Sequence, residues 1–174
     1  ASKILFDNYP YLVSGQISFQ SKGGALKASQ NGEIIYLDFP ADDSLESIEN
    51  HLALETALGE QPTQLFRGRD DFLAVYNSQS QIEKMRPDFV KVAAVDSRGV
   101  VVTAPGEQED FVSRCFFPGM GVDEDPVTGS AHTMLIPYWA SVMQGKEFVA
   151  RQLSRRGGEL YCALRGDRVL IGGY

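Results

Sequence analysis

Apolar residues recur between positions 131 and 143 at the spacing of a single helix face. They follow the pattern i, i+3, i+4, i+7, i+8, i+11, i+12 and comprise Ala131, Met134, Leu135, Tyr138, Trp139, Val142 and Met143. A stripe of this kind predicts a helix with one side buried against a core. Gly129 and Ser130 stand immediately before the stripe, so a polar loop ends where this helix begins.

Shorter apolar runs between turn residues predict strands along much of the remaining chain. The runs cover 16–20, 24–30, 33–39, 64–67, 72–76, 90–95, 100–104, 111–117, 147–154, 159–164 and 168–171. Turn residues predict hairpins at 21–24 and at 31–32. A third hairpin is expected at Ser97-Arg98-Gly99, where it would join the runs 90–95 and 100–104.

Three further helices are expected, at 1–8, between 44 and 58, and at 80–85. The middle one presents Leu45, Ile48, Leu52 and Leu58 near helical spacing, with Asp43 or Ser44 as its capping residue. His51 would lie on the surface of that helix. The strand-rich pattern with one dominant helix per lobe favours an α+β fold over a doubly wound parallel sheet.

The chain of 174 residues is long enough for one sizeable domain or two small lobes. Its net charge of −7 and scattered basic residues argue against a nucleic-acid partner. No apolar run approaches the roughly 20 residues of a membrane span, and no signal peptide is visible, so we expect a cytoplasmic protein without a membrane partner. Cys115 and Cys162 stand singly in apolar runs, which predicts buried free thiols and no metal site.

The loop at 121–132 concentrates the candidate chemistry. It places Asp123, Glu124 and Asp125 before Pro126 and the start of the predicted helix. Free backbone N–H groups at a helix start bind anions. An acid beside such a site makes chemical sense if a carboxylate ligand binds the amides while Asp125 transfers protons. A plain Asp-Pro turn followed by a helix cap is the alternative, and the spacing does not decide between them.

Other polar segments are weaker candidates. Residues 151–159 contain three arginines and a Gly-Gly pair, which suits either an anion site or a solvated hairpin tip. Residues 67–71 are interpreted as a solvated turn. His132, in the first helical turn, is expected to be neutral and to serve in packing or at the surface. No sequence motif supports a serine or cysteine nucleophile.

These segments resemble the PhzF family of phenazine-biosynthesis-like isomerases. The resemblance runs over nearly the whole chain and includes the stretch Gln20-Ser21…Leu37-Asp38-Phe39-Pro40. It is most specific in Ser113-Arg114-Cys115-Phe116-Phe117-Pro118-Gly119-Met120-Gly121, in Glu124-Asp125-Pro126-Val127-Thr128-Gly129-Ser130-Ala131-His132, and in the loop Arg151-Gln152…Ser154…Gly157-Gly158.

The resemblance implies a diaminopimelate-epimerase-like fold, in which two pseudo-symmetric α+β lobes each wrap a sheet around a central helix. It implies a proton shift on a small carboxylate-bearing metabolite in the cleft between the lobes, with no cofactor. By resemblance, Asp125 and Ser130 are the catalytic residues. The substrate-binding residues would be Thr128, Gly129, Ser130, Ala131 and Gly157.

One departure from the family leaves the enzyme status open. Members carry a catalytic Glu and a Gly-His-Ala-Thr block in the first lobe, and neither is in this sequence. We therefore expect residues 1–42 to be a remnant of the first lobe and residues 43–174 to be the second lobe. On this expectation the chain is part of an isomerase, and it pairs either with a second copy as a homodimer or with an N-terminal half.

Two alternatives to the isomerase remain. The chain could be a non-catalytic protein that binds small carboxylates, or an interaction protein that retains the fold. It could also be a two-thiol racemase, which needs two cysteines facing each other across the cleft. Cys115 and Cys162 both fall in the expected second lobe, which disfavours the racemase.

Overall fold

The computed structural model describes residues 1–9, 15–21 and 24–174, and eleven strands within these ranges form one mixed sheet. The strands are β1 (Gln16–Ser21), β2 (Gly24–Asn31), β3 (Ile34–Pro40), β4 (Glu46–Ile48), β5 (Gln64–Arg67), β6 (Asp71–Val75), β7 (Gly99–Pro105), β8 (Phe111–Phe116), β9 (Glu147–Gln152), β10 (Gly158–Arg165) and β11 (Arg168–Gly173). Their order across the sheet is β1-β2-β3-β11-β10-β9-β8-β7-β6-β5-β4. Only β6–β7 and β8–β9 are parallel among these neighbours.

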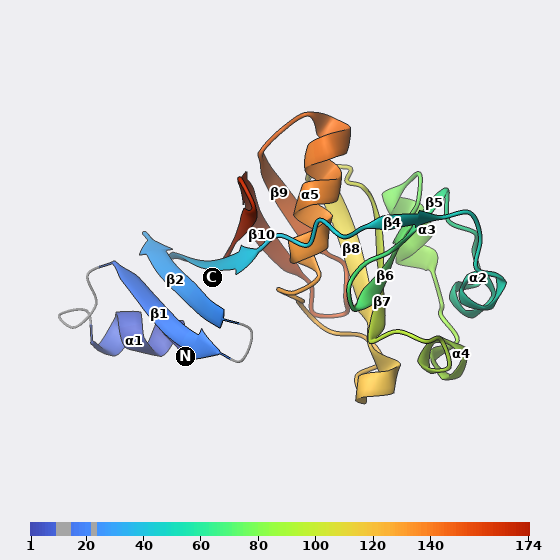
Figure 1. Cartoon of the computed structure of the whole chain (residues 1–174), viewed down its shortest axis with the longest axis horizontal. Helices are drawn as coiled ribbons and strands as arrows, with labels where there is room; N and C mark the ends of the chain where they lie inside the picture. Colours follow the sequence, from blue (N-terminus) through green and yellow to red (C-terminus); the bar gives the residue numbers. More distant parts are fainter. Residues whose placement is uncertain (10–14, 22–23) are drawn as a thin grey trace.

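Helices cover both faces of the sheet. They are α1 (Ser2–Asn8), α2 (Leu52–Leu58), α3 (Gln79–Lys84), α4 (Phe89–Ala93) and α5 (His132–Met143), with a 3₁₀ turn, η1, at Pro118–Met120. Figure 1 shows α1 and the β1–β2 hairpin at one end of the molecule and α2 to α4 at the other. The arrangement is α+β, as the sequence pattern predicts.

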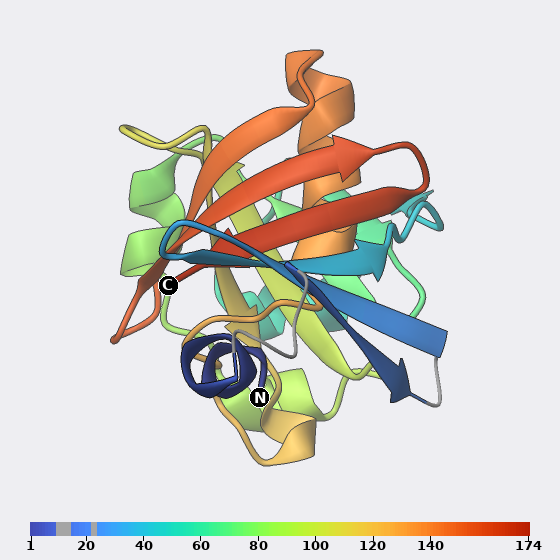
Figure 2. The same ribbon diagram turned by 90° about the vertical axis from the view of Figure 1, so that its left-hand side faces the viewer.

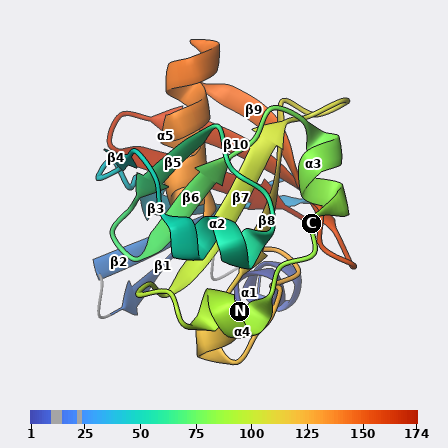
Figure 3. The same ribbon diagram turned by 90° about the vertical axis from the view of Figure 1, so that its right-hand side faces the viewer.

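Two apolar cores lie on opposite faces of the central strands. The first is formed by α5 with inward side chains of β6 to β11, among them Phe111, Phe148 and Ile171. The second lies between strands β5 to β8 and the helices α2, α3 and α4 (Figure 3). Within the predicted apolar stripe of α5, the residues from Ala131 to Trp139 are buried, but Val142 is 53% exposed and Met143 37% exposed.

Strand β3 joins the β1–β3 segment to the rest of the sheet. It pairs antiparallel with β11 from Ile35–Gly173 to Pro40–Arg168. The Arg168 Nε donates to the Asp38 carboxylate at 2.5 Å, and the Asp42 amide donates to the Thr133 carbonyl at 2.9 Å. Figure 2 shows these strands in front of α5. The end of β3 is thereby tied to the first turn of α5.

Most of the predicted strands and short helices are confirmed within one or two residues at each end. The helix at 1–8 is α1, the helix at 80–85 is α3, and the Asn31-Gly32 turn joins β2 to β3. Lys22 and Gly23, which form the middle of the turn predicted at 21–24, lie outside the described residues.

The helix predicted between 44 and 58 is wrong in its first half. Residues 46–48 form β4, where Ile48 pairs with Leu65 of β5. The helix α2 starts only at Leu52, because His51 caps it: the His51 Nδ1 accepts from the Leu54 amide at 3.2 Å. His51 therefore stands at the helix start and not on a helix surface.

The hairpin predicted at Ser97-Arg98-Gly99 is also wrong. Residues 89–93 form α4, whose start is capped by the Asp88 carboxylate accepting from the Lys91 amide at 3.2 Å. Val90 is 82% exposed while Val92 is buried. The β-branched residues suggested a strand, but the cap and the single buried side match a short helix.

The close packing at Gly172 gives a test of the β3–β11 junction. A Cβ added to Gly172 would lie 2.6 Å from Cε1 of Tyr36, whereas one added to Gly173 would meet nothing within 4 Å. We expect Gly172→Ala to lower the free energy of unfolding by about 1–3 kcal/mol, because the tyrosine ring must move. Urea unfolding measures this, with Gly173→Ala as the matched control. Equal stability of the two variants would contradict the described packing.

Candidate functional site

The loop between β8 and α5 carries the predicted site residues except Gly157, which lies between β9 and β10. It is attached to the end of β8 by an isolated bridge between Phe117 and Val122, and the Asp125 amide donates to the Cys115 carbonyl at 3.0 Å. The loop therefore folds back over the strand that precedes it. Within the loop, Asp125 contacts Thr128, which shortly precedes the start of α5.

Asp125 and Thr128 are joined to each other and to Gln152 at the end of β9. The Thr128 hydroxyl donates to the Asp125 Oδ2 at 2.5 Å. The Gln152 Nε2 donates to the Asp125 carbonyl at 2.7 Å, and the Thr128 amide donates to the Gln152 Oε1 at 2.7 Å. Thr128 is only 6% exposed and Gln152 is fully buried, so the contacts are shielded from water.

The arginine-rich segment contributes a second support to the same loop. The Ser154 hydroxyl donates to the Pro126 carbonyl at 2.7 Å and accepts from the Gly157 amide at 3.0 Å. Gly157 has φ +69°, a left-handed conformation that glycine adopts without strain. Arg151 forms an ion pair with Glu109 at 3.3 Å, so its positive charge is already paired within the protein.

The residues Gly129, Ser130 and Ala131 form a turn that extends the start of α5. The first helical amides are satisfied there, because the His132 amide donates to the Gly129 carbonyl at 3.0 Å and the Thr133 amide to the Ser130 carbonyl at 3.2 Å. The amides of Gly129, Ser130 and Ala131 have no acceptor within residues 1–9, 15–21 and 24–174. Three backbone donors of this turn thus have no partner in these ranges, although Ala131 itself is fully buried while Gly129 and Ser130 are not.

The turn lies between two cavities. Gly129 and Gly157 line a cavity of about 760 Å³ together with Lys3, Leu37 and Arg156. Ser130 instead lines a cavity of about 400 Å³ whose other residues include Arg69, Asp70, Asp71, Arg98 and Thr133. Asp125 lines neither of the two. The structure therefore brings Gly129 and Gly157 together but separates both from the Ser130 side chain.

Arg98 is a site residue that the sequence did not suggest. Its Nε donates to the Asp71 Oδ1 at 2.9 Å, a second guanidinium nitrogen contacts the Asp71 Oδ2, and the same nitrogen lies 3.5 Å from the Ser130 Oγ. Asp71 is almost fully buried, so it holds the guanidinium in place. Hydrogen bonding to Asp71 raises the pKa of Arg98 further above its usual range. The cation therefore persists beside Ser130.

Glu124 has a structural role although it adjoins Asp125. It forms a bidentate ion pair with Arg114, with distances of 2.7 Å to Nε and 3.0 Å to Nη2. The remaining Arg114 nitrogen donates to the Ile82 carbonyl at 2.8 Å and to the Met85 carbonyl at 3.0 Å. Glu124 thus anchors the loop to Arg114 of β8, and through it to the C-terminal end of α3.

His132 is buried below the loop. Its Nδ1 lies 2.8 Å from the Thr128 carbonyl, so this nitrogen carries the proton and donates it. Its Nε2 is buried without a partner in the described part of the chain. Burial lowers the pKa of His132 to about 4, against a usual value of 6.5. The prediction of a neutral packing histidine agrees with this environment.

The two cysteines are free and buried, as predicted. Burial raises the pKa of the Cys115 thiol well above its usual range and that of the Cys162 thiol to about 12. Both belong to the same core against α5 and do not face each other across a cleft. This arrangement gives no thiolate pair for a two-thiol racemase.

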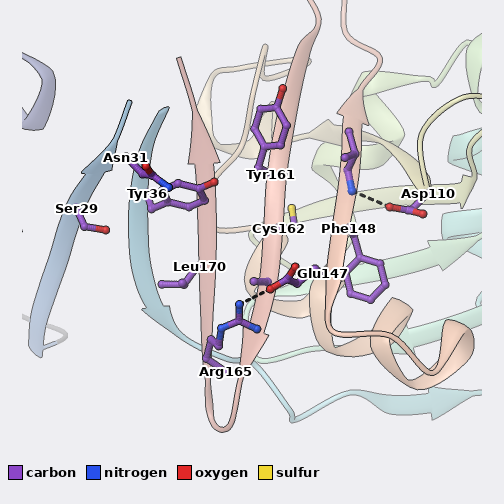
Figure 4. Close-up of a pocket in the computed structure, with 12 residues that line it drawn as sticks. Ser29, Asn31, Tyr36, Asp110, Glu147, Phe148, Tyr161, Cys162, Arg165 and Leu170 are labelled. Carbon is purple, nitrogen blue, oxygen red and sulfur yellow. Dashed lines mark hydrogen bonds and ion pairs between the residues drawn. The ribbon is translucent and has the colours of Figure 1, made fainter. Parts of the chain in front are cut away.

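A third cavity, of about 540 Å³, contains none of the predicted site residues. It lies over β9, β10, β11, β3 and β2. Tyr36 of β3 and Tyr161 of β10 stand on the two strands that flank β11, and Arg165 pairs with Glu147 at 2.5 Å (Figure 4). In the described ranges, no cluster of His, Cys, Asp and Glu is arranged to hold a metal ion. No helix found there has the length and apolar character needed to cross a membrane.

Comparison with known proteins places the chain in a family. The sequence profile described as phenazine biosynthesis-like protein, PhzC-PhzF, matches residues 1–174. The chain belongs to this family. An uncharacterized isomerase of Pseudomonas aeruginosa is 45% identical over 100% of this chain and 66% of its own length. Phenazine biosynthesis-like domain-containing protein 2 of Mus musculus is 36% identical over 89% of this chain and 60% of its own length.

Solved structures of PhzF-family proteins share the fold. The crystal structure of a PhzF-family protein from Enterococcus faecalis matches with a TM-score of 0.91 and 39% identity, over 99% of this chain and 66% of that one. A PhzC/PhzF protein from Clostridium difficile matches with a TM-score of 0.89 and 32% identity, over 99% of this chain and 66% of that one. The fold is therefore diaminopimelate-epimerase-like. This chain spans 60% to 66% of the lengths of these relatives.

Burial of His132 predicts a loss of stability in acid. The neutral form is favoured in the folded state, so the unfolded chain binds the extra proton between pH 6.5 and about 4. The free energy of unfolding should therefore fall as the pH drops through this window, by up to about 3 kcal/mol from this group.

Urea unfolding of the wild type and of His132→Asn at a series of pH values measures this contribution. The asparagine cannot ionise but keeps a donor near the Thr128 carbonyl, so the variant should lose part of the pH dependence. His51→Asn, which replaces the other histidine, should leave the His132 contribution in place. An unchanged pH dependence in His132→Asn would refute the burial argument.

Proposed function

We propose that this chain carries part of the active site of a PhzF-like isomerase, which shifts a proton on a small carboxylate-bearing metabolite without a cofactor. Membership of the family and the isomerase names of two curated relatives support the reaction class. The observation that carries the proposal is the Asp125 carboxylate, which accepts from the Thr128 hydroxyl, while Thr128 directly precedes the unpartnered amides of the 129–131 turn.

The proposed roles follow from the chemistry of each group. A carboxylate on the substrate binds the amides of the 129–131 turn, where the helix dipole adds a favourable positive potential. Ser130 donates its hydroxyl to the same group, and Asp125 transfers the proton. Stabilisation of the substrate carboxylate lowers the energy of the enolate-like charge that develops when a neighbouring C–H is deprotonated.

The arrangement of charges supports Asp125 over its neighbours for this role. Glu124 is neutralised by its bidentate contact with Arg114. Asp125 receives only the neutral Thr128 hydroxyl among the described residues, so its charge is not compensated by a cation. A proton carrier needs such an available carboxylate.

The same proposal divides the chain at residues 42 and 43. Residues 1–42 would belong to a first lobe and residues 43–174 to a second, so that the β3–β11 pairing crosses between them. The cavity of about 760 Å³ is lined from both sides, by Lys3 and Leu37 on one and by Gly129 and Gly157 on the other. On this proposal the substrate binds at the Gly129 side of this cavity, and its carboxylate reaches across the 129–131 turn to Ser130, which lines the neighbouring cavity of about 400 Å³.

Deuterium incorporation from heavy water tests the proposed reaction on many candidate substrates at once. The protein as its gene encodes it is incubated with a panel of small carboxylates in D₂O, and mass spectrometry detects a gain of one deuteron. We expect Asp125→Asn to lower kcat for a labelled compound by about 10²–10⁴-fold, because the proton carrier is removed. The control variant is Asp123→Asn, which changes an exposed acid of the same loop and should retain activity.

Retention of most activity by Asp125→Asn, with wild-type folding, would rule out its proposed role. If carboxylates bind but none gains deuterium, the alternative of a non-catalytic carboxylate-binding protein replaces the isomerase.

Ser130→Ala tests the anion site separately from turnover. A hydrogen bond to a charged group contributes about 1.5–3 kcal/mol, so the Kd for a carboxylate probe such as benzoate should rise about tenfold or more. Isothermal titration measures the Kd, with Ser141→Ala near the other end of α5 as the control. Equal binding of benzoate by the wild type and Ser130→Ala would show that Ser130 does not bind the carboxylate.

A further inference from the structure

Gln152 is a fully buried amide whose donor and acceptor atoms are both used on a single loop. Its Oε1 accepts from the Thr128 amide at 2.7 Å. Its Nε2 donates to the Asp125 carbonyl at 2.7 Å and to the Thr128 Oγ1 at 3.1 Å. The relative exposure of the residue is 0%. The side chain therefore binds the first and last residues of the segment from Asp125 to Thr128.

The chemistry of the partners fixes which way this amide points. The Thr128 backbone N–H can only donate, so the atom that faces it must be the Gln152 oxygen. The NH₂ group is then directed at the Asp125 carbonyl and the Thr128 hydroxyl oxygen. Because NH₂ can only donate, the hydroxyl oxygen must accept, and the single hydroxyl hydrogen is left to be donated to the Asp125 Oδ2 at 2.5 Å.

The remaining polar atom of Thr128 is also engaged. Its carbonyl accepts from the buried His132 Nδ1 at 2.8 Å. Every hydrogen-bonding group of Thr128 is thus assigned one partner or more, and the residue has a single favourable orientation. A buried network in which each of these groups is satisfied is rigid, because any rotation leaves a donor or an acceptor unpaired.

We propose that Gln152 is a positioning residue for Asp125: by orienting the Thr128 hydroxyl, it holds the Asp125 carboxylate in the geometry that proton transfer requires. This inference rests on the proposed isomerase function. Gln152 does not act on the substrate itself, and the amides of the 129–131 turn do not depend on its side chain. Its loss should therefore affect the chemical step more than the binding of the substrate.

Kinetics of deuterium incorporation test this division of roles. For a carboxylate that the wild type labels, Gln152→Leu should lower kcat by about 100-fold, which is the usual cost of a displaced catalytic group. The KM should change little. The matched control is Gln81→Leu, because Gln81 also bridges two backbone amides, those of Asn77 and Ser78, with its Oε1, but lies at the start of α3. The Gln81→Leu variant should be less stable than the wild type but should keep the same kcat.

A second pair of variants tests the inference independently, in case Gln152→Leu does not fold. Thr128→Val is nearly isosteric and removes only the hydroxyl that links Gln152 to Asp125, so it should lower kcat as Gln152→Leu does. Thr128→Ser keeps the hydroxyl and should restore kcat. A wild-type kcat in either Gln152→Leu or Thr128→Val would overturn the inference while leaving the isomerase proposal intact.

Hydrogen exchange gives a readout that needs no turnover. The Thr128 amide should exchange slowly with D₂O in the wild type, and Gln152→Leu should accelerate it while Gln81→Leu does not. Should the wild type label no carboxylate, the isomerase proposal fails, and with it the catalytic part of this inference. Unchanged exchange at Thr128 in Gln152→Leu would then also refute the positioning of the loop.

Discussion

The handedness of two crossover connections determines where the helices and the site lie. Strands β6 and β7 are parallel and joined through α3 and α4, while β8 and β9 are parallel and joined through α5. Both connections advance in the same direction across the sheet, but β7 and β8 are antiparallel. Crossovers between parallel strands are right-handed, so the two sets of helices must cover opposite faces. The two separate cores show this arrangement.

The second crossover also explains why the loop from Asp125 to Thr128 and the Gln152 side chain meet. The loop follows the carboxyl end of β8, and Gln152 lies at the carboxyl end of β9, which is parallel to β8. Parallel neighbours end at the same edge of a sheet, where α/β connections usually form ligand sites. The buried Gln152 side chain therefore lies against the loop from Asp125 to Thr128, although 24 positions separate Thr128 from Gln152.

The sequence predicted those parts of the fold and site that depend on local pattern. The buried stripe of α5, most strands and the motif from Asp125 to the 129–131 turn all stand out in short windows. The strand prediction at 90–95 is wrong because valine favours strands. The helix α4 forms there instead, packed beside α2 and η1. The contacts of Gln152 to Thr128 and of Arg98 to Ser130 depend on sheet order, which no local signal encodes.

The two adjacent acids of the motif have different surroundings, and only one of them forms an ion pair in the described part of the chain. Glu124 meets the buried guanidinium of Arg114, and the pair neutralises both charges while anchoring the loop. Asp125 is held instead by neutral groups: its carboxylate by the Thr128 hydroxyl, its carbonyl by Gln152 and its amide by the Cys115 carbonyl. A cation in their place would position Asp125 equally well, but it would neutralise the carboxylate as Arg114 neutralises Glu124. Neutral hydrogen bonds fix the orientation without adding a positive charge, which is the combination that the proposed role of Asp125 as a proton carrier requires.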